Sequence, residues 1–597
     1  MQRALQIFSL VILAVVGVLA FRLFELQVYD GGRYLKLSEE NRFRVMKIPA
    51  PRGIIYDRNE IPLVENVPLF SVSIVPDSSR LPDFKALAKL LALDEAEVEG
   101  EITKKGRSPF VPIRLKQGLD FAEVARIEAH KSDFPGLFIE TDIGREYPLG
   151  KVAAHLIGYL GRIPPGQSGN PEFRNLPPDA MIGQWGVEKM YDRDLRGTPG
   201  ERVIEVNALG RELRLIRENQ PAVGKDVHLS IDIGIQKAVE HSFGDKAGAL
   251  VALNPNTGEV LALESLPSFD PNVFTQGIKP SDWKSLMDNK KKPMLNRALQ
   301  SQYPPGSTFK IVTAIAALEE GVIDPSAKVT CTGGLTHGGH TFGCWKKGGH
   351  GPVDLHQAIV GSCDVYFYEL GRRLGIEKLH KWAAAFGIGK ETGLGLIRER
   401  QGLMPSAEWK KEKQKIPWYL GDTFISSIGQ GAVTATPIQM AQMMSWVASG
   451  GKLYRPTLIK GEYEPSAVLA LKPDTIRRVR AALHGVVNEG GGTGKNAFSA
   501  IVPVGGKTGT AQVVGKAHGR SGEQYLDHAW FVAFAPTDKP ELAMAVFVEH
   551  GGGGGAVAAP IAKAAIEAYF GPKKRAGQPE KKPAEEKAAS AEGGGIH

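Results

Sequence analysis

An apolar segment near the N-terminus constrains the fold of this chain more than any other feature. Residues 4–24 read ALQIFSLVILAVVGVLAFRLF, and only Gln6, Ser9 and Arg22 among them are polar. About 20 apolar residues, rising 1.5 Å each in a helix, cross a ~30 Å hydrocarbon core, where a helix satisfies its own backbone hydrogen bonds. Residues 1–24 are therefore predicted to form a short cytoplasmic stub and a transmembrane anchor helix.

The residues that flank this segment predict its orientation. Arg3 and the terminal amino group precede it, so the positive-inside rule leaves the N-terminus in the cytoplasm and the following chain outside. A cleaved signal peptide is the alternative, because residues 18–20 (Val-Leu-Ala) form an acceptable cleavage site. Apolar residues continue beyond that site through Leu23 and Phe24, which favours an uncleaved anchor.

The rest of the sequence divides into two parts and a tail. Short β-type runs between Pro and Gly turns fill residues 25–225, whereas residues 226–571 combine strands with long helical runs. Strand pairs predicted within 249–263 and 529–548 enclose mostly helical sequence, which indicates an α+β fold with an antiparallel sheet flanked by helices. Residues 572–597 are rich in Lys, Glu, Ala and Pro, and we expect a disordered tail.

The overall composition excludes several classes of protein. Apolar residues make up 42% and charged residues 23% of the 597 residues, which is typical of a globular protein. The net charge of +8 suits contact with anionic lipids but is small for this length. No zinc-finger, helix-turn-helix or RNA-binding signature is present, so no nucleic-acid partner is expected.

Three short motifs carry chemistry, and the first is the segment YPPGSTFK at residues 303–310. Its chain-breaking residues precede a helix predicted over 309–320. Ser307 and Lys310 are three residues apart, so they share one face of the first turn and the lysine can act as base for the serine hydroxyl. A lone Ser-x-x-Lys, however, is more often a capping serine and a surface lysine.

The second motif is Ser362-Cys363-Asp364, which precedes another helical run. Ser362 can relay a proton between Lys310 and a leaving amine, and Asp364 can hydrogen-bond Lys310. The same three residues on their own are an ordinary start of a helix.

The third motif is GKTGT at residues 506–510, at the start of a predicted strand. Lys507 and Thr508 offer a cation and a hydroxyl to a substrate carboxylate, and Gly509 allows a substrate to lie close to the backbone. The Thr510 amide can join that of Ser307 as an oxyanion hole. A glycine in a strand is otherwise most often a bulge.

Taken together, in this order, the motifs resemble those of penicillin-binding proteins and serine β-lactamases. The resemblance covers residues 25–571. It implies that 25–225 form the non-catalytic, dimerisation-type pedestal domain of class B and that 226–571 form a transpeptidase domain with an all-helical subdomain. The segments that resemble the pedestal signature are Arg52–Asn59, Arg145–Pro148, His155–Tyr159 and Gly186–Glu188.

Within class B, the chain resembles the elongation-type penicillin-binding protein 2 group. Asp364, which replaces the Asn that is usual in the second motif, supports this resemblance. The segments that carry it are Met404-Pro405, Glu408–Lys410, Pro417–Tyr419, Gly429–Gly431 and Thr436–Met440. The resemblance implies a peptidoglycan D,D-transpeptidase of cell-wall elongation and rod-shape maintenance, acting through a serine acyl-enzyme. Alternatives are a division-type transpeptidase, a D,D-carboxypeptidase or penicillin-hydrolysing enzyme, and a penicillin sensor. The residues it implies are catalytic Ser307, Lys310, Ser362, Asp364 and Lys507, and substrate-binding Thr508, Gly509 and Thr510.

The resemblance also implies partners and a location. The substrates are peptidoglycan stem peptides, β-lactams are inhibitors, and no organic cofactor is expected. A SEDS-family glycosyltransferase and other membrane proteins of the elongation machinery are implied partners. The protein is placed in the bacterial inner membrane, with its catalytic domain in the periplasm.

A zinc site is predicted from spacing alone. All three cysteines lie between residues 331 and 363, with four histidines among them. Cys331, Cys344, His350 and Cys363 form a C-x12-C-x5-H-x12-C set, and three thiolates with one imidazole suit tetrahedral structural Zn2+. Because Cys363 lies inside the second motif, a bound ion would hold that motif in place.

Two alternatives to a metal site stay open for the cysteines. A Cys331–Cys344 disulfide would leave one buried thiol, and three small core residues would have no common role. His337 or His340 can also take the place of His350 in the predicted set.

Overall fold

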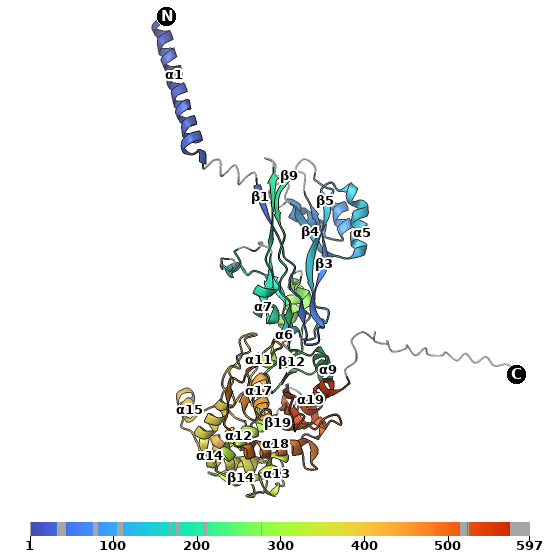
Figure 1. Cartoon of the computed structure of the whole chain (residues 1–597), viewed down its shortest axis with the longest axis vertical. Helices are drawn as coiled ribbons and strands as arrows, with labels where there is room; N and C mark the ends of the chain where they lie inside the picture. Colours follow the sequence, from blue (N-terminus) through green and yellow to red (C-terminus); the bar gives the residue numbers. More distant parts are fainter. Residues whose placement is uncertain are drawn as a thin grey trace, which may run out of the picture.

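A computed structural model of the chain describes residues 2–32, 43–75, 81–103, 112–167, 169–174, 176, 180–206, 212–275, 277–513, 522 and 525–572. In Figure 1 a separate N-terminal helix leads to an elongated, strand-rich part, which joins a larger part of helices around a sheet. The predicted α+β class is confirmed. Apart from Pro572, the tail for which we predict disorder lies outside the described residues.

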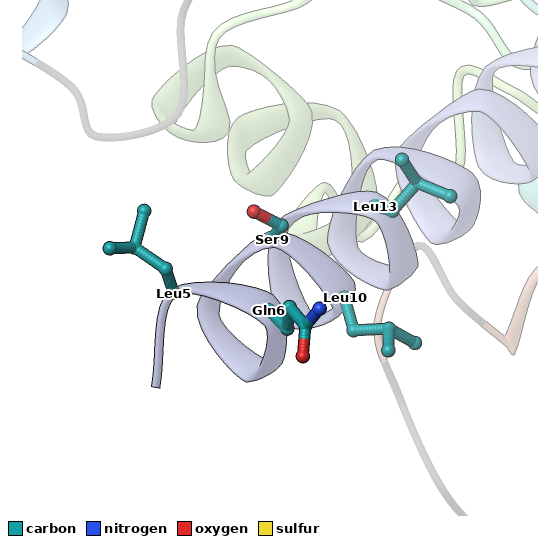
Figure 2. A pocket seen from close by; sticks show the side chains of 5 residues that line it. All are labelled: Leu5, Gln6, Ser9, Leu10 and Leu13. Atoms are coloured by element: carbon teal, nitrogen blue, oxygen red, sulfur yellow. The ribbon is translucent and has the colours of Figure 1, made fainter. Parts of the chain in front are cut away.

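Helix α1 (Gln2–Phe24) continues into a π-helical turn, η1 (Glu25–Tyr29), and stands away from the other elements (Figure 1). Within the span Leu5–Tyr29, an 18-residue window has a mean hydropathy of 2.6, and none of that window is buried against protein. An apolar helix without protein cover is stable only where lipid replaces water. Helix α1 is thus a candidate membrane anchor. Figure 2 shows five side chains that line a hollow on its surface, Leu5, Gln6, Ser9, Leu10 and Leu13.

The strand-rich part is built on two larger sheets, beside a short pair of β6 (Leu160–Arg162) and β7 (Met181–Gly183). The first has the order β10-β2-β3-β4, with β5 also paired to β3, and the second has the order β1-β8-β9. Helices α3 (Phe84–Leu91), α4 (Glu95–Thr103) and α5 (Phe121–His130) share an apolar core with β3, β4 and β5. The strands are β1 (Phe43–Ile48), β2 (Ile55–Tyr56), β3 (Pro62–Ile74), β4 (Ile113–Leu119), β5 (Leu137–Glu146), β8 (Gly200–Val206), β9 (Glu212–Asn219) and β10 (Val227–His228).

A buried ion cluster joins the pedestal-like segments of the sequence. Glu188, in α7 (Gly186–Met190), is fully buried and accepts from Arg52 Nη2 and Arg145 Nε, each at 2.8 Å. Arg52 also pairs with Asp192 at 2.8 Å. Burial opposes ionisation of Glu188, but the two guanidiniums hold the pKa of this carboxyl below its usual range. Segments far apart in sequence are thereby tied together at one point.

The larger part is organised on an antiparallel five-stranded sheet of order β12-β11-β21-β20-β19. A hairpin of β11 (Gly248–Leu253) and β12 (Val260–Leu266) forms one side, and β20 (His528–Ala535) and β21 (Leu542–Val548) lie between it and β19 (Gly505–Ala511). The two strand pairs predicted from the sequence therefore meet in one sheet, and β19, with the third motif, is its edge.

Helices cover both faces of this sheet, which explains why β11, β20 and β21 are apolar almost throughout. Side chains of α9 (Ile233–Phe243) and α19 (Gly554–Phe570) share one buried cluster with alternate residues of the strands. The other face packs against α17 (Pro437–Ala448), whose residues are all buried. Figure 1 shows α17 and α19 around the sheet.

The helices of the larger part that lie outside the sheet layers are interrupted by short strands, so the expectation of an all-helical subdomain is corrected. Two short strand pairs interrupt these helices. Strands β14 and β15 form a hairpin at the turn Gly338-Gly339, and β13 and β16 pair with each other on either side of that hairpin. The strands of these two pairs are β13 (Val329–Cys331), β14 (Gly334–His337), β15 (His340–Gly343) and β16 (Gly351–Val353), and the helices are α12 (Lys310–Glu319), α13 (Leu355–Val360), α14 (Asp364–Ala385), α15 (Ala407–Gln414), α16 (Leu420–Ser427) and α18 (Pro473–Asn488).

Replacing Glu188 tests the buried ion cluster. We expect Glu188→Gln to lower the free energy of unfolding by about 3–5 kcal/mol, because buried Arg145 loses its counter-charge and Arg52 keeps only that of Asp192. The carboxylate stabilises the fold above the pKa of an unfolded glutamate, so the difference from the unaltered protein should shrink as the pH falls through the lower folded-state pKa. Chemical denaturation at pH 7 and at pH 3–4 measures both effects.

Glu172→Gln is the matched control, because Glu172 pairs with Arg196 while 46% of its side chain is exposed. An exposed ion pair contributes about 0–1 kcal/mol. If the two variants lower the free energy of unfolding by the same amount, the buried cluster does not stabilise the fold as we expect.

Candidate active site

The segment that carries Ser307 is held in place by contacts on both sides. Ser307 lies in a 3-10 turn, η5 (Gly306–Phe309), directly before α12. Trp530 Nε1 donates to Pro304 O at 3.0 Å, and Gly306 N donates to Gly429 O at 2.9 Å. Ser307 itself is only half-buried, whereas Gly306 and Thr308 are buried. A rigid, accessible hydroxyl at a helix start is the result.

Two buried lysines converge on the second motif. Lys310 Nζ donates to Asp364 Oδ1 at 2.7 Å, to Ser362 O at 2.9 Å and to Ser362 Oγ at 3.3 Å. Lys507 Nζ donates to Ser362 Oγ at 2.9 Å and to Thr508 O at 3.2 Å. Both lysines have no exposed surface. The Ser362 hydroxyl thus lies between the amino groups of the first and third motifs.

Burial and neighbouring charges shift the pKa values of Lys507 and Asp364 in this cluster. Burial, with the charge of Lys310 nearby, lowers the pKa of Lys507 well below its ordinary value. Burial opposes ionisation of Asp364, but Lys310 outweighs this effect and the pKa of the carboxyl is lowered. The site therefore holds one ion pair, Lys310 with Asp364, and a second amine that releases its proton readily. Such a set can accept and return protons through the Ser362 hydroxyl.

The backbone of Ser362 is unusual, because its φ of 57° lies in the left-handed region. A residue other than glycine in this conformation costs of order 1–3 kcal/mol and is typical of functional sites. Here the conformation presents both the carbonyl and the hydroxyl of Ser362 to Lys310.

Strand β19 offers an open edge beside Ser307. Among the described residues, no strand pairs with its outer side. The Gln430 side chain donates to Thr510 O at 2.8 Å on that side. Since both backbone groups of one residue in an antiparallel strand point the same way, the Thr510 N–H faces this edge too. An extended peptide can pair with such an edge.

The absence of a side chain at Gly509 serves the protein's own packing. A Cβ there would lie 2.8 Å from Pro305 O and 2.9 Å from Thr308 Cγ2. The space is therefore filled by the Ser307 segment, which corrects the expectation that Gly509 makes room for a substrate. Gly554, the first residue of α19, also allows close packing within the protein, because a Cβ there would lie 2.2 Å from Trp530 O on β20.

Two further residues near the site, Trp345 and Thr493, belong to no sequence motif. The Trp345 backbone N–H donates to Asp364 Oδ2 at 3.0 Å and its indole N–H to Ser362 O at 3.1 Å, yet 59% of the residue is exposed. Thr493 hydrogen-bonds Thr508, Oγ1 to Oγ1, at 2.8 Å. Both lie in loops without periodicity, so only the three-dimensional arrangement brings them to the motifs.

The four residues of the predicted zinc set come together. Their ligand atoms all lie within 4.8 Å of one another, and His350 is the histidine that joins, while His337 and His340 lie on the exposed β14–β15 hairpin. His350 Nδ1 lies 3.7 Å from Cys331 Sγ and 3.5 Å from Cys344 Sγ. Zn–S bonds of about 2.3 Å and Zn–N bonds of about 2.0 Å in a tetrahedron separate ligand atoms by roughly 3.5–3.8 Å.

Other properties of this cluster fit a metal site. The three cysteines are free, with no disulfide between them. A hydrogen bond from Cys363 lowers the pKa of the Cys344 thiol to about 5, whereas the same contact and burial raise the pKa of Cys363. His350 Nε2 lies 3.1 Å from Gly361 O, the outer contact that orients a metal-binding imidazole.

Comparison with known families decides which proteins this chain resembles. The penicillin binding protein transpeptidase domain matches residues 248–567, and the penicillin-binding protein dimerisation domain matches residues 47–229. The chain is 37% identical over 588 residues to the peptidoglycan D,D-transpeptidase MrdA of Acinetobacter baumannii, covering 93% of this chain and 85% of that protein. The chain belongs to the penicillin-binding protein 2 family.

Further relatives and solved structures agree. The MrdA of Escherichia coli is 34% identical, over 93% of this chain and 92% of that protein. Penicillin-binding protein 2 of Helicobacter pylori in complex with MreC aligns with a TM-score of 0.77 at 30% identity, over 88% of this chain and 98% of that chain. The Pseudomonas aeruginosa PBP2 bound to WCK 5153 aligns with a TM-score of 0.68 at 33% identity, over 88% and 96% of the chains.

These findings confirm the predicted family and activity. This penicillin-binding protein is a peptidoglycan D,D-transpeptidase of the elongation type, and the names of its relatives favour the transpeptidase over the division-type, hydrolase and sensor alternatives.

The close packing of α19 on β19 generates a prediction. Gly554→Ala should lower the free energy of unfolding by about 1–3 kcal/mol, because the added methyl overlaps the backbone of β20. Gly490→Ala is the control, since a Cβ there meets nothing within 4 Å. Thermal and denaturant unfolding of both variants measure the difference, and a Gly554→Ala protein as stable as the control would refute this packing.

Proposed function

We propose that Ser307 is the nucleophile of this transpeptidase and attacks the carbonyl of the penultimate D-alanine in a stem pentapeptide. The observation that carries the proposal is the position of the Ser362 hydroxyl. It accepts hydrogen bonds from Lys507 and from Lys310, the residue one helical turn after Ser307. As the Ser307 oxygen bonds to the carbonyl carbon, its proton passes to Lys310, and Lys310 gives one of its own protons through the Ser362 hydroxyl to the amine of Lys507. The bond to the terminal D-alanine then breaks, and Ser362 returns a proton to the leaving amine.

The second half of the reaction reverses these roles. An amine from a neighbouring stem peptide attacks the acyl-enzyme ester and forms the new C–N bond. Ser307 leaves as its alkoxide and regains a proton, and the amine loses one to the same lysine–serine set. The product is a crosslink between two stems, and the site is returned to its initial protonation.

Strand β19 supplies binding and charge stabilisation in this proposal. The N–H groups of Thr510 and Ser307 are donors for the oxyanion that forms at the attacked carbonyl. The outward direction of the Thr510 N–H and the contact of Gly306 with Thr510 support this pairing. Lys507 and Thr508 receive the terminal carboxylate of the donor stem. Penicillins, which carry a carboxylate beside a strained amide, would acylate Ser307 in the same pose.

Labelled penicillin tests the nucleophile. Ser307→Ala should show no acylation and no crosslinked product, because the attacking oxygen is absent, while the unaltered protein gains the mass of one penicillin on the peptide that contains Ser307. Mass spectrometry of the digested protein locates the adduct. Ser326→Ala, a change on the exposed surface, should be acylated normally.

Two results would refute this assignment. One is acylation of Ser307→Ala at another serine at the normal rate. The other is release of a shortened stem peptide without crosslinks when both stems are supplied, which indicates a hydrolase.

We also propose the placement and partners of the chain. Helix α1 anchors it in the bacterial inner membrane with the N-terminus in the cytoplasm, as Arg3 before the apolar span supports. The other domains then lie in the periplasm. A Helicobacter pylori relative forms a complex with MreC, and another similar chain, with a TM-score of 0.73, belongs to a peptidoglycan synthase complex. We propose elongation-machinery partners of this kind, among them a SEDS-family glycosyltransferase that contacts α1 and the pedestal.

We propose Zn2+ as a structural ion bound by Cys331, Cys344, His350 and Cys363. The convergence of their ligand atoms and the outer contact of His350 support it. A bound ion would link the two short strand pairs to the start of α14, and thus support the conformation of Ser362. No step of the reaction passes through the metal.

Elemental analysis tests the zinc proposal. The full-length protein purified without chelator should contain about one zinc per chain. Cys344→Ser should lose most of it, with a lower melting temperature and slower acylation, because a ligand is removed. His340→Ala should keep the metal, since His340 lies outside the cluster. Well under one zinc per chain, with a Cys331–Cys344 disulfide in the peptide map, would refute the proposal.

A further inference from the structure

Thr493 forms a hydroxyl pair with Thr508 beside the third motif. It lies in the loop that follows α18, and its Oγ1 lies 2.8 Å from Thr508 Oγ1. Thr508 is 7% exposed and Thr493 is half-buried, so the pair sits at the inner wall of the site.

The backbone around the pair fixes both side chains. A Cβ on Gly555 would lie 2.3 Å from Thr493 O and 3.5 Å from Thr508 Cγ2, so the second residue of α19 packs directly against both threonines. Asn496 Nδ2 donates to Gly555 O at 2.9 Å and ties the loop to α19. The two hydroxyls therefore keep their separation without help from a ligand.

A pair of hydroxyl groups carries two hydrogens, and the hydrogen bond between the two groups uses only one of them. A threonine hydroxyl donates one hydrogen and accepts at two lone pairs, and its hydrogen rotates to suit its neighbours. If Thr493 donates to Thr508, the hydrogen of Thr508 is released toward the cleft. Successive hydrogen bonds in a chain polarise one another, so the outer donor becomes stronger.

We propose that Thr493 is a positioning residue for the carboxylate of the donor stem: it donates to Thr508 and turns the Thr508 hydroxyl hydrogen toward that carboxylate. The proposal rests on the proposed function, in which Lys507 and Thr508 bind this group. A hydroxyl from a loop outside the three motifs, acting through Thr508, thereby controls substrate selection.

The test uses two penicillins that differ only in the recognised group. The free acid presents a carboxylate, and its methyl ester does not. Thr493→Val keeps the shape of the side chain and removes the hydroxyl. It should slow acylation of the full-length protein by the acid about tenfold, the equivalent of ~1.4 kcal/mol. Its rate with the methyl ester should be unchanged.

Further variants separate positioning from structure. Thr493→Ser retains the hydroxyl and should acylate at nearly the normal rate. In the background of Thr508→Val, replacing Thr493 should have no further effect, because the residue through which it acts is gone. Thr493→Ala, with the same acid and ester comparison, provides a second measurement if the valine variant has a lower melting temperature.

Three outcomes would overturn the inference. The first is a normal acylation rate of Thr493→Val with the acid, the second is equal slowing with acid and ester, and the third is an effect that adds fully to that of Thr508→Val. In all three cases acylation of Ser307 in the unaltered protein still supports the proposed function. Failure of the unaltered protein to be acylated at Ser307 would overturn the proposed function and this inference together.

Discussion

The burial of Lys310 dictates how the catalytic half of this protein is assembled. A lysine without exposed surface needs partners for its ammonium group, since an unpaired charge in the interior is very costly. Asp364 supplies the counter-charge and Ser362 supplies two oxygens. To provide them, α14 must begin beside α12, and Ser362 must adopt a strained backbone. The approach of Lys507 to the same hydroxyl then ties β19 to both helices.

Much of this arrangement follows from the sequence, because the relevant signals are local. The apolar run over residues 4–24 and the apolar strands of the sheet predict their structures through composition alone. The three motifs predict the cluster at Ser362, since each is short and contains residues with a specific chemical use. The Cys and His spacing predicts that four ligand atoms converge, and they do so within 4.8 Å.

The remainder depends on contacts between distant segments, which have no local signal. Gly509 is an example, because the reason for its missing side chain is the carbonyl of Pro305, about 200 residues earlier in the chain. Trp345 and Thr493 reach the site from irregular loops, where neither helical nor strand periodicity exists. The two short strand pairs have no sequence signature either, because their strands are only three or four residues long.

The edge position of β19 has a consequence for selectivity. Sheet edges in soluble proteins are usually blocked, because any extended chain can add to them. Here Gln430 occupies the edge at Thr510 with its side-chain amide, which acts as a stop, and no described strand pairs with the segment from Lys507 to Gly509 on that side. A guest strand is therefore limited in length and held mainly by its main chain. Main-chain pairing of this kind depends on the direction of the guest peptide, and by itself it does not distinguish one guest side chain from another.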